Sequence, residues 1–136
     1  MDFNQMREIV QELNVNTNFL TYAVLIGIMA DFATGIAKGY KTDGKVSSSK
    51  LRSGGFKKAG MILVVFLSYG LSLLFNDTRH IIFNTIQIYY VYTESVSIIE
   101  NLIELGVDVP WPLRKILGDK KHSLEEPEDE EYDHQI

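Results

Sequence analysis

The stretch from Ile81 to Leu105 is long enough for an α-helix to cross a bilayer, yet it carries polar side chains at regular intervals. A membrane-spanning helix needs about 20 residues of mainly apolar sequence. Gln87, Glu94 and Asn101 follow one another at intervals of seven residues. Hydrocarbon cannot satisfy polar groups, so such a stripe needs another protein helix or water against it. The stretch therefore favours a bundle of helices in a membrane.

Two further apolar stretches reach membrane length or come near it. Residues 17–37 are free of charge until Asp31, and residues 59–75 carry no charge. We predict an all-α multipass membrane protein with three transmembrane helices, at 16–38, 58–76 and 80–105. The last two are separated by only a few residues and should form an antiparallel hairpin. In the alternative, the third helix lies on the inner membrane surface, because Glu100, Asn101 and Glu104 are near its inner end.

The two ends of the chain differ from this apolar body. Residues 1–15 place Phe3, Met6, Val10 and Leu13 on one face of an amphipathic helix, which lies on a membrane surface or packs on protein. Seven of the eighteen acidic residues fall between Glu125 and Asp133. We predict that residues 106–136 form a tail that is acidic and disordered from about residue 119.

A basic segment, residues 39–57, connects the first two predicted spans and is expected to be a loop. The positive-inside rule assigns it to the cytoplasm. The N-terminus and the turn at 76–80 then lie outside, and the C-terminus lies inside. The same charges could bind anionic lipid headgroups. The residues predicted to set topology or contact headgroups are Lys38, Lys41, Lys45, Lys50, Arg52, Lys57 and Lys58.

Polar and small side chains on the first and third spans form the candidate functional surface. A carboxylate near the middle of a span costs about 2.5–3.5 kcal/mol on insertion scales, so Asp31 should face protein or water, or be protonated. Three interpretations remain open: a structural packing face with a neutral, hydrogen-bonded Asp31, an oligomer or pore contact, and a proton-relay or transport acid. The predicted pore or oligomer seam comprises Gly27, Asp31, Thr34, Gly35, Gln87, Glu94, Ser97, Glu100 and Asn101.

Several classes of protein are disfavoured by the sequence. There is no cysteine, and the three histidines are scattered, so we predict no disulfide, no thiolate chemistry and no metal site. No paired nucleophile and base and no phosphate-binding loop is evident, so we expect neither an enzyme nor a cofactor. No aromatic stacking platform accompanies the basic residues, which disfavours nucleic acid as a partner.

Four motifs together resemble a known family. Asp31-x-x-Thr34-Gly35 closes the first span, and Ser48-Ser49-Lys50-x-x-x-Gly54 with Lys57-Lys58 leads into the second. Glu94-x-x-Ser97-x-x-Glu100-Asn101 lies in the third span, followed by Gly106-x-x-x-Pro110. In this order the motifs resemble the phage holin family, which includes clostridial toxin-secretion holins. The resemblance covers roughly residues 19 to 117. The acidic tail departs from the lysine-rich tails common in holins.

The resemblance implies a function. Holins oligomerise in the cytoplasmic membrane of the host bacterium and open lesions at a set time, so that endolysin reaches the cell wall. Endolysin would be a functional partner without direct contact, and an antiholin a regulatory one. Two alternatives are kept: a small multipass channel, transporter subunit or secretion accessory protein, and an antiholin or scaffold that delays a holin.

Overall fold

The computed structural model describes residues 2–12 and 16–115, and every regular element in these ranges is an α-helix. The helices are α1 (Phe3–Glu12), α2 (Thr17–Asp43), α3 (Ser48–Leu74) and α4 (Ile81–Glu104). A further helical turn covers residues 111–115. The all-α prediction is therefore confirmed, while the acidic tail lies outside the described residues.

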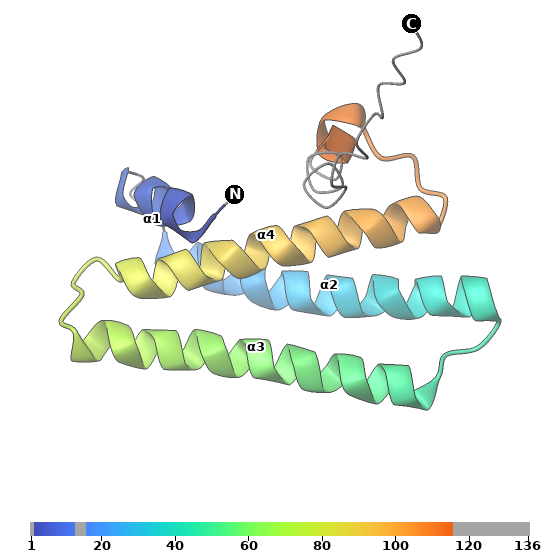
Figure 1. Cartoon of the computed structure of the whole chain (residues 1–136), viewed down its shortest axis with the longest axis horizontal. Helices are drawn as coiled ribbons and strands as arrows, with labels where there is room; N and C mark the ends of the chain where they lie inside the picture. Colours follow the sequence, from blue (N-terminus) through green and yellow to red (C-terminus); the bar gives the residue numbers. More distant parts are fainter. Residues whose placement is uncertain (1, 13–15, 116–136) are drawn as a thin grey trace, which may run out of the picture.

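Three long helices lie side by side and alternate in direction (Figure 1). Helix α4 contacts each of the other three helices, whereas α2 and α3 contact each other much less. We call the end of the bundle that holds residues 44–47 and 105–107 the basic end, and the end that holds residues 75–80 the hairpin end. The predicted antiparallel hairpin is present as α3 and α4.

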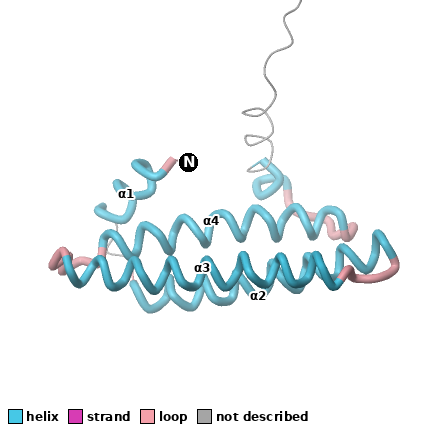
Figure 2. Tube along the Cα trace, turned by 60° about the horizontal axis from the view of Figure 1, so that its bottom comes forward, coloured by secondary structure: helices cyan, strands magenta, loops and turns pink. Residues whose placement is uncertain are grey.

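Helix α1 packs on protein, which is the second of the two alternatives for the amphipathic segment. It lies across α4 toward the hairpin end, on the same side of the bundle as the turn at 111–115 (Figures 1 and 2). Met6 is 1% exposed, whereas Phe3 remains 49% exposed. Because one of the apolar residues of α1 is fully buried, the helix is attached to the bundle by its apolar face.

The helix ends explain where the observed boundaries differ from the predicted ones. Helix α2 begins after Asn16, whose side chain accepts a hydrogen bond from the Phe19 N–H. It ends at Gly44, which adopts the left-handed conformation and donates to the Tyr40 carbonyl. Lysines do not stop a helix, and Gly39 keeps the helical conformation, so α2 continues until Gly44 adopts the left-handed cap. The expected loop at 39–57 is consequently helical except for residues 44–47.

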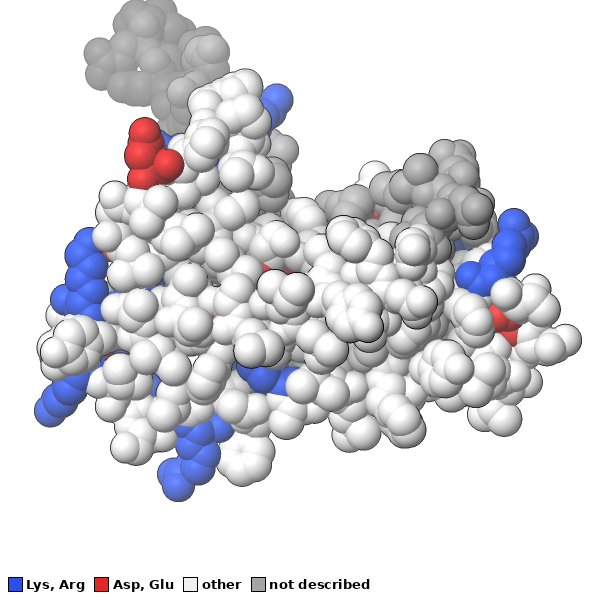
Figure 3. All heavy atoms as spheres, turned by 180° about the vertical axis from the view of Figure 1, so that it is seen from behind, with Lys and Arg blue, Asp and Glu red and all other residues white. Residues whose placement is uncertain are grey.

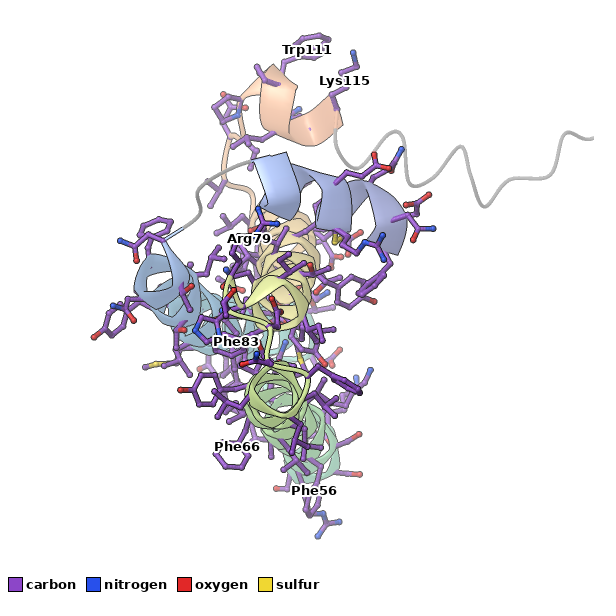
Figure 4. All side chains as sticks on the ribbon, turned by 90° about the vertical axis from the view of Figure 1, so that its left-hand side faces the viewer. Phe56, Phe66, Arg79, Phe83, Trp111 and Lys115 are labelled. Atoms are coloured by element: carbon purple, nitrogen blue, oxygen red, sulfur yellow. The ribbon has the colours of Figure 1, made fainter. Side chains whose placement is uncertain are left out.

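Burial in the bundle is inverted relative to a water-soluble protein. Helix α3 buries only Ser68 and Ser72, and α4 buries polar residues along with apolar ones. Meanwhile Phe66 and Leu74 are 71% and 81% exposed. Phe56 and Phe66 point away from the neighbouring helices in Figure 4. A continuous apolar surface of this kind suits hydrocarbon rather than water.

The charged side chains support the same interpretation. On the face shown in Figure 3, most of the surface is uncharged, and most of the Lys and Arg side chains lie toward the basic end. Helices α2 and α3 are each long and apolar enough to cross a membrane. Helix α4 is not among these candidates: it has 24 residues, but polar side chains lower its hydropathy. The structure thus yields two candidate spans where the sequence predicted three.

Candidate functional site: a polar seam inside the bundle

An ion cluster joins the three long helices in the basic half of the bundle. The ammonium group of Lys58 on α3 lies 2.7 Å from Asp31 Oδ2 on α2 and also donates to the carboxylate of Glu94 on α4. These side chains are 17%, 13% and 5% exposed, in the order Lys58, Asp31, Glu94. One lysine therefore pairs with two carboxylates, and each of the three long helices contributes one residue to the ion cluster.

Neutral side chains extend this cluster. Asn101 Nδ2 donates to Asp31 Oδ1 at 3.2 Å and to Thr34 Oγ1 at 3.1 Å. The Thr34 hydroxyl in turn donates to the Asp31 main-chain carbonyl at 3.1 Å. Asp31 thus receives an ammonium group from α3 and an amide from α4. The structure supplies Asp31 with a cation inside the protein, which none of the three sequence-based interpretations had included.

Glycines on α2 bring its backbone close to α4 at this site. A Cβ atom added at Gly27 would lie 3.4 Å from the Glu94 Cβ, and one at Gly35 would lie 3.8 Å from Asn101 Nδ2. Small residues allow such close approach of helices in membranes. The small face of α2 is therefore packed against α4 of the same chain.

The hairpin half of the seam contains no such ion cluster. The Thr21 hydroxyl donates to Gln87 Oε1 at 2.7 Å, and Gln87 Nε2 donates to Asn84 Oδ1 at 3.4 Å. Closer to the turn, the Ser72 hydroxyl donates to Asp77 Oδ2 at 3.3 Å. Among the described residues, no buried side-chain nitrogen or oxygen lacks a hydrogen-bond partner. The buried polar groups of the seam therefore all form their hydrogen bonds within one chain.

The structure brings most of the predicted seam residues together. Gln87, Glu94 and Asn101 are buried, and Gly27, Asp31, Thr34 and Gly35 face them from α2. Ser97 is half-buried and lines a cavity beside the cluster, whereas Glu100 is exposed. Thr21, which sequence reasoning missed, lies on the same face of α2 as Ile28, one heptad later.

The predicted basic residues separate into three groups. Lys58 belongs to the ion cluster, although the sequence placed it with the topology or headgroup residues. Lys38 pairs with Glu104 at 3.3 Å, and Lys50 pairs with Asp43 at 3.6 Å. Lys41 donates to the Leu105 carbonyl at 2.7 Å and so helps to close the C-terminus of α4. The remaining residues, all exposed, are Lys45, Arg52 and Lys57.

The side chains at the site are suited to pairing helices. Within residues 2–12 and 16–115, no group of three His, Asp or Glu side chains is arranged to hold a metal ion. The arrangement can hold three helices together, and it can present charge and hydrogen-bonding groups wherever those helices separate.

Comparison with known proteins identifies the family. The sequence model of the bacteriophage holin family matches residues 8–121. The chain belongs to the bacteriophage holin family. This family consists of membrane pore-forming proteins and not of enzymes. The match extends beyond both ends of the resemblance seen in the motifs, and together with the two apolar helices it indicates a membrane protein.

Proteins of Clostridium perfringens and Listeria are similar in sequence to this chain. An uncharacterised 14.9 kDa protein of Clostridium perfringens is 36% identical over 95 residues, covering 69% of this chain and 70% of the relative. An uncharacterised protein of Listeria monocytogenes is 28% identical over 104 residues, covering 74% of this chain and 70% of the relative. No solved structure matches the chain.

Proposed function

We propose that this protein is a holin that oligomerises in the cytoplasmic membrane of a bacterial host and opens lesions, through which endolysin reaches the cell wall. The observation that carries the proposal is a polar seam with an ion cluster enclosed by helices whose outer surfaces are apolar. A protein that only anchors or scaffolds needs no such seam, because buried charges are costly in a membrane.

All three long helices cross the membrane in this proposal. Helix α4 has 24 residues and, at about 1.5 Å per residue, is about 36 Å long, which exceeds the hydrocarbon thickness of about 30 Å. Its buried Gln87, Glu94 and Asn101 bond to side chains of α2 or α3, so they do not require water while the bundle is closed. The basic end is cytoplasmic, since Lys45 and Arg52 lie exposed at or close to it and suit anionic lipid headgroups.

Lesion formation exchanges the partners of the seam. While the density of the protein in the membrane is low, Asp31, Glu94 and Lys58 of each chain pair with one another. Above a critical density, helices pair between neighbouring copies, and the polar faces of α2 and α4 line a wetted opening. The apolar faces of α2 and α3 stay against lipid. Because lipid tails are as apolar as leucine, the specific polar contacts decide which helices pair.

Inducible expression in a bacterial host tests the function. A holin stops growth abruptly at a fixed time, and the culture lyses only when a cytoplasmic endolysin is supplied. A gradual leak of ions that is independent of endolysin would instead indicate a channel or secretion accessory protein. Absence of both effects, with delayed lysis by a co-expressed holin, would indicate an antiholin. Fractionation must place the protein in the membrane in each case.

A further inference from the structure

A cavity of about 300 Å³ lies beside the ion cluster, between α2 and α3. Its walls include Gly35 and Gly39 on α2 and Gly54 on α3, whose missing side chains leave the space open. Ser97 and Asn101 on α4 contribute to its lining. The cavity exists because α2 and α3 both pack on α4 while making little contact with each other.

The cavity connects two different environments. Lys45, Ser47 and Lys50 line it at the basic end, where α2 ends and α3 begins. Asp31, Lys58 and Asn101 line its deep end. From Gly39 to Asp31 the cavity follows two turns of α2, a rise of about 12 Å. It therefore leads from the end of the bundle to the buried charges.

Water fits the deep, charged end of this cavity, while apolar side chains such as Phe32, Ile36 and Leu51 line much of the rest. A site holds water when it is roomy enough and offers two to four polar partners, and a volume of about 300 Å³ accommodates several molecules. The deep end offers a carboxylate, an ammonium group and an amide. Charged side chains within membranes characteristically face water-filled cavities or pair with one another, and the cluster around Lys58 would do both.

We propose that the cavity is a water-filled vestibule that enters the closed bundle from the basic end and stops at Lys58, Asp31 and Glu94. The barrier to water is then the hairpin half of the bundle, where the neutral contacts of Thr21, Gln87 and Asn84 close the seam. This inference rests on the proposed membrane location. If the basic half already holds water, a lesion has to open only the hairpin half of the bundle.

A set of glycine-to-cysteine variants tests the vestibule, because the chain contains no cysteine. Gly35→Cys, Gly39→Cys and Gly54→Cys place a thiol in the wall of the cavity. A Cβ atom at these positions meets nothing closer than 3.7 Å. Gly60→Cys and Gly70→Cys are matched controls on α3. An added Cβ atom at either position meets nothing within 4 Å, and neither residue lines the cavity. Lys45→Cys reports the side of the membrane that the basic end faces.

Labelling is measured in sealed membrane vesicles of both orientations with a membrane-impermeant thiol reagent, before any lysis. The three cavity variants should react from the same side as Lys45→Cys. The two controls should react at least about tenfold more slowly, because thiolates form and react poorly in apolar surroundings. Ser97→Cys, a nearly isosteric change in the cavity lining, should react like the cavity variants and decides the test if a glycine variant fails to insert.

The possible failures can be told apart. If Lys45→Cys reacts but Gly35→Cys, Gly54→Cys and Ser97→Cys are as slow as Gly60→Cys, the vestibule is overturned and the proposed function stands. If Gly60→Cys and Gly70→Cys react as fast as Lys45→Cys, α3 is not embedded in the membrane. That result would overturn the vestibule and the proposed holin topology together.

Discussion

The two halves of the polar seam hold the same three helices together by different interactions. In the basic half, Lys58 joins a carboxylate from α2 to a carboxylate from α4 beside a cavity. In the hairpin half, hydroxyl and amide groups such as Thr21 and Gln87 form short neutral hydrogen bonds. Removing one member of a buried ion cluster leaves a charge without a partner, whereas removing a hydroxyl leaves a neutral amide without one hydrogen bond. Substitutions in the basic half should therefore have larger effects.

The largest effect is expected for Lys58→Met. It leaves Asp31 and Glu94 in the bundle without their cation, and breaking a buried pair in this way costs about 3–5 kcal/mol. We expect poor membrane accumulation and no lysis, measured by fractionation and by culture density after induction. Lys57→Met is the control, because Lys57 is the exposed neighbour of Lys58. Normal lysis timing in Lys58→Met would remove the ion cluster from the mechanism.

Two substitutions of Glu94 distinguish whether lysis requires a charge at this position or only a polar side chain. Glu94→Gln keeps a hydrogen-bond acceptor for Lys58 and leaves one lysine with one carboxylate, so assembly and lysis should persist with shifted timing. Glu94→Leu should insert well but abolish or strongly shift lysis, because α4 loses the centre of its polar face. Normal timing in both Glu94→Leu and Asp31→Leu would contradict the proposed role of the seam.

A smaller effect is expected where α2 and α4 approach most closely. In Gly27→Ala the new methyl group would lie 3.4 Å from the Glu94 Cβ, at the tight limit of van der Waals contact, which leaves no slack between the helices. The expected cost is at or below the lower end of the range for overpacking, about 1 kcal/mol. Thermal unfolding in detergent, followed by circular dichroism, should show a lower midpoint than for Gly39→Ala, whose added methyl group meets nothing within 4 Å. Equal midpoints would show that the contact is not tight.

The smallest effect is expected in the hairpin half. Thr21→Val removes the hydrogen bond to Gln87 but keeps the shape of the side chain, and such bonds contribute on average about 0.6 kcal/mol in membrane proteins. The same unfolding measurement should show a shift smaller than that of Gly27→Ala. Thr42→Val is the control, because that hydroxyl donates only to the Lys38 carbonyl in its own helix. A shift larger than that of Gly27→Ala would reverse the comparison between the two halves of the seam.

Much of the seam could be predicted from the sequence because helical periodicity reports which side chains share a face. Gln87, Glu94 and Asn101 are seven residues apart, and all three are buried and hydrogen-bonded. The role of Lys58 was missed because it was counted as one of a run of positive charges. The available signal was its position on α3: Lys58 lies on the same face as Ser68 and Ser72, the two residues that α3 buries.

The helix boundaries and the pairing partners were less predictable. Whether α2 stops at residue 38 or continues to Asp43 depends on which of two glycines turns left-handed: Gly39 stays helical, and Gly44 forms the cap. Whether the small face of α2 packs within the chain or between chains depends on the balance of two similar contacts. The spacing of Gly27 and Gly35 is compatible with both, and the structure adopts the first.

The connection between α2 and α3 is short, and this limits how far α3 can move away from its own α2 when the proposed lesion forms. The five backbone steps from Asp43 to Ser48 span at most about 17 Å when extended. Packed helix axes lie about 8–10 Å apart, so α3 can move by no more than about two helix positions relative to its own α2. In the proposed mechanism, therefore, only copies that already touch can exchange α3. Growth of the proposed lesion would be a nearest-neighbour process, whose rate would depend on how closely the chains are crowded and not on their total number in the cell.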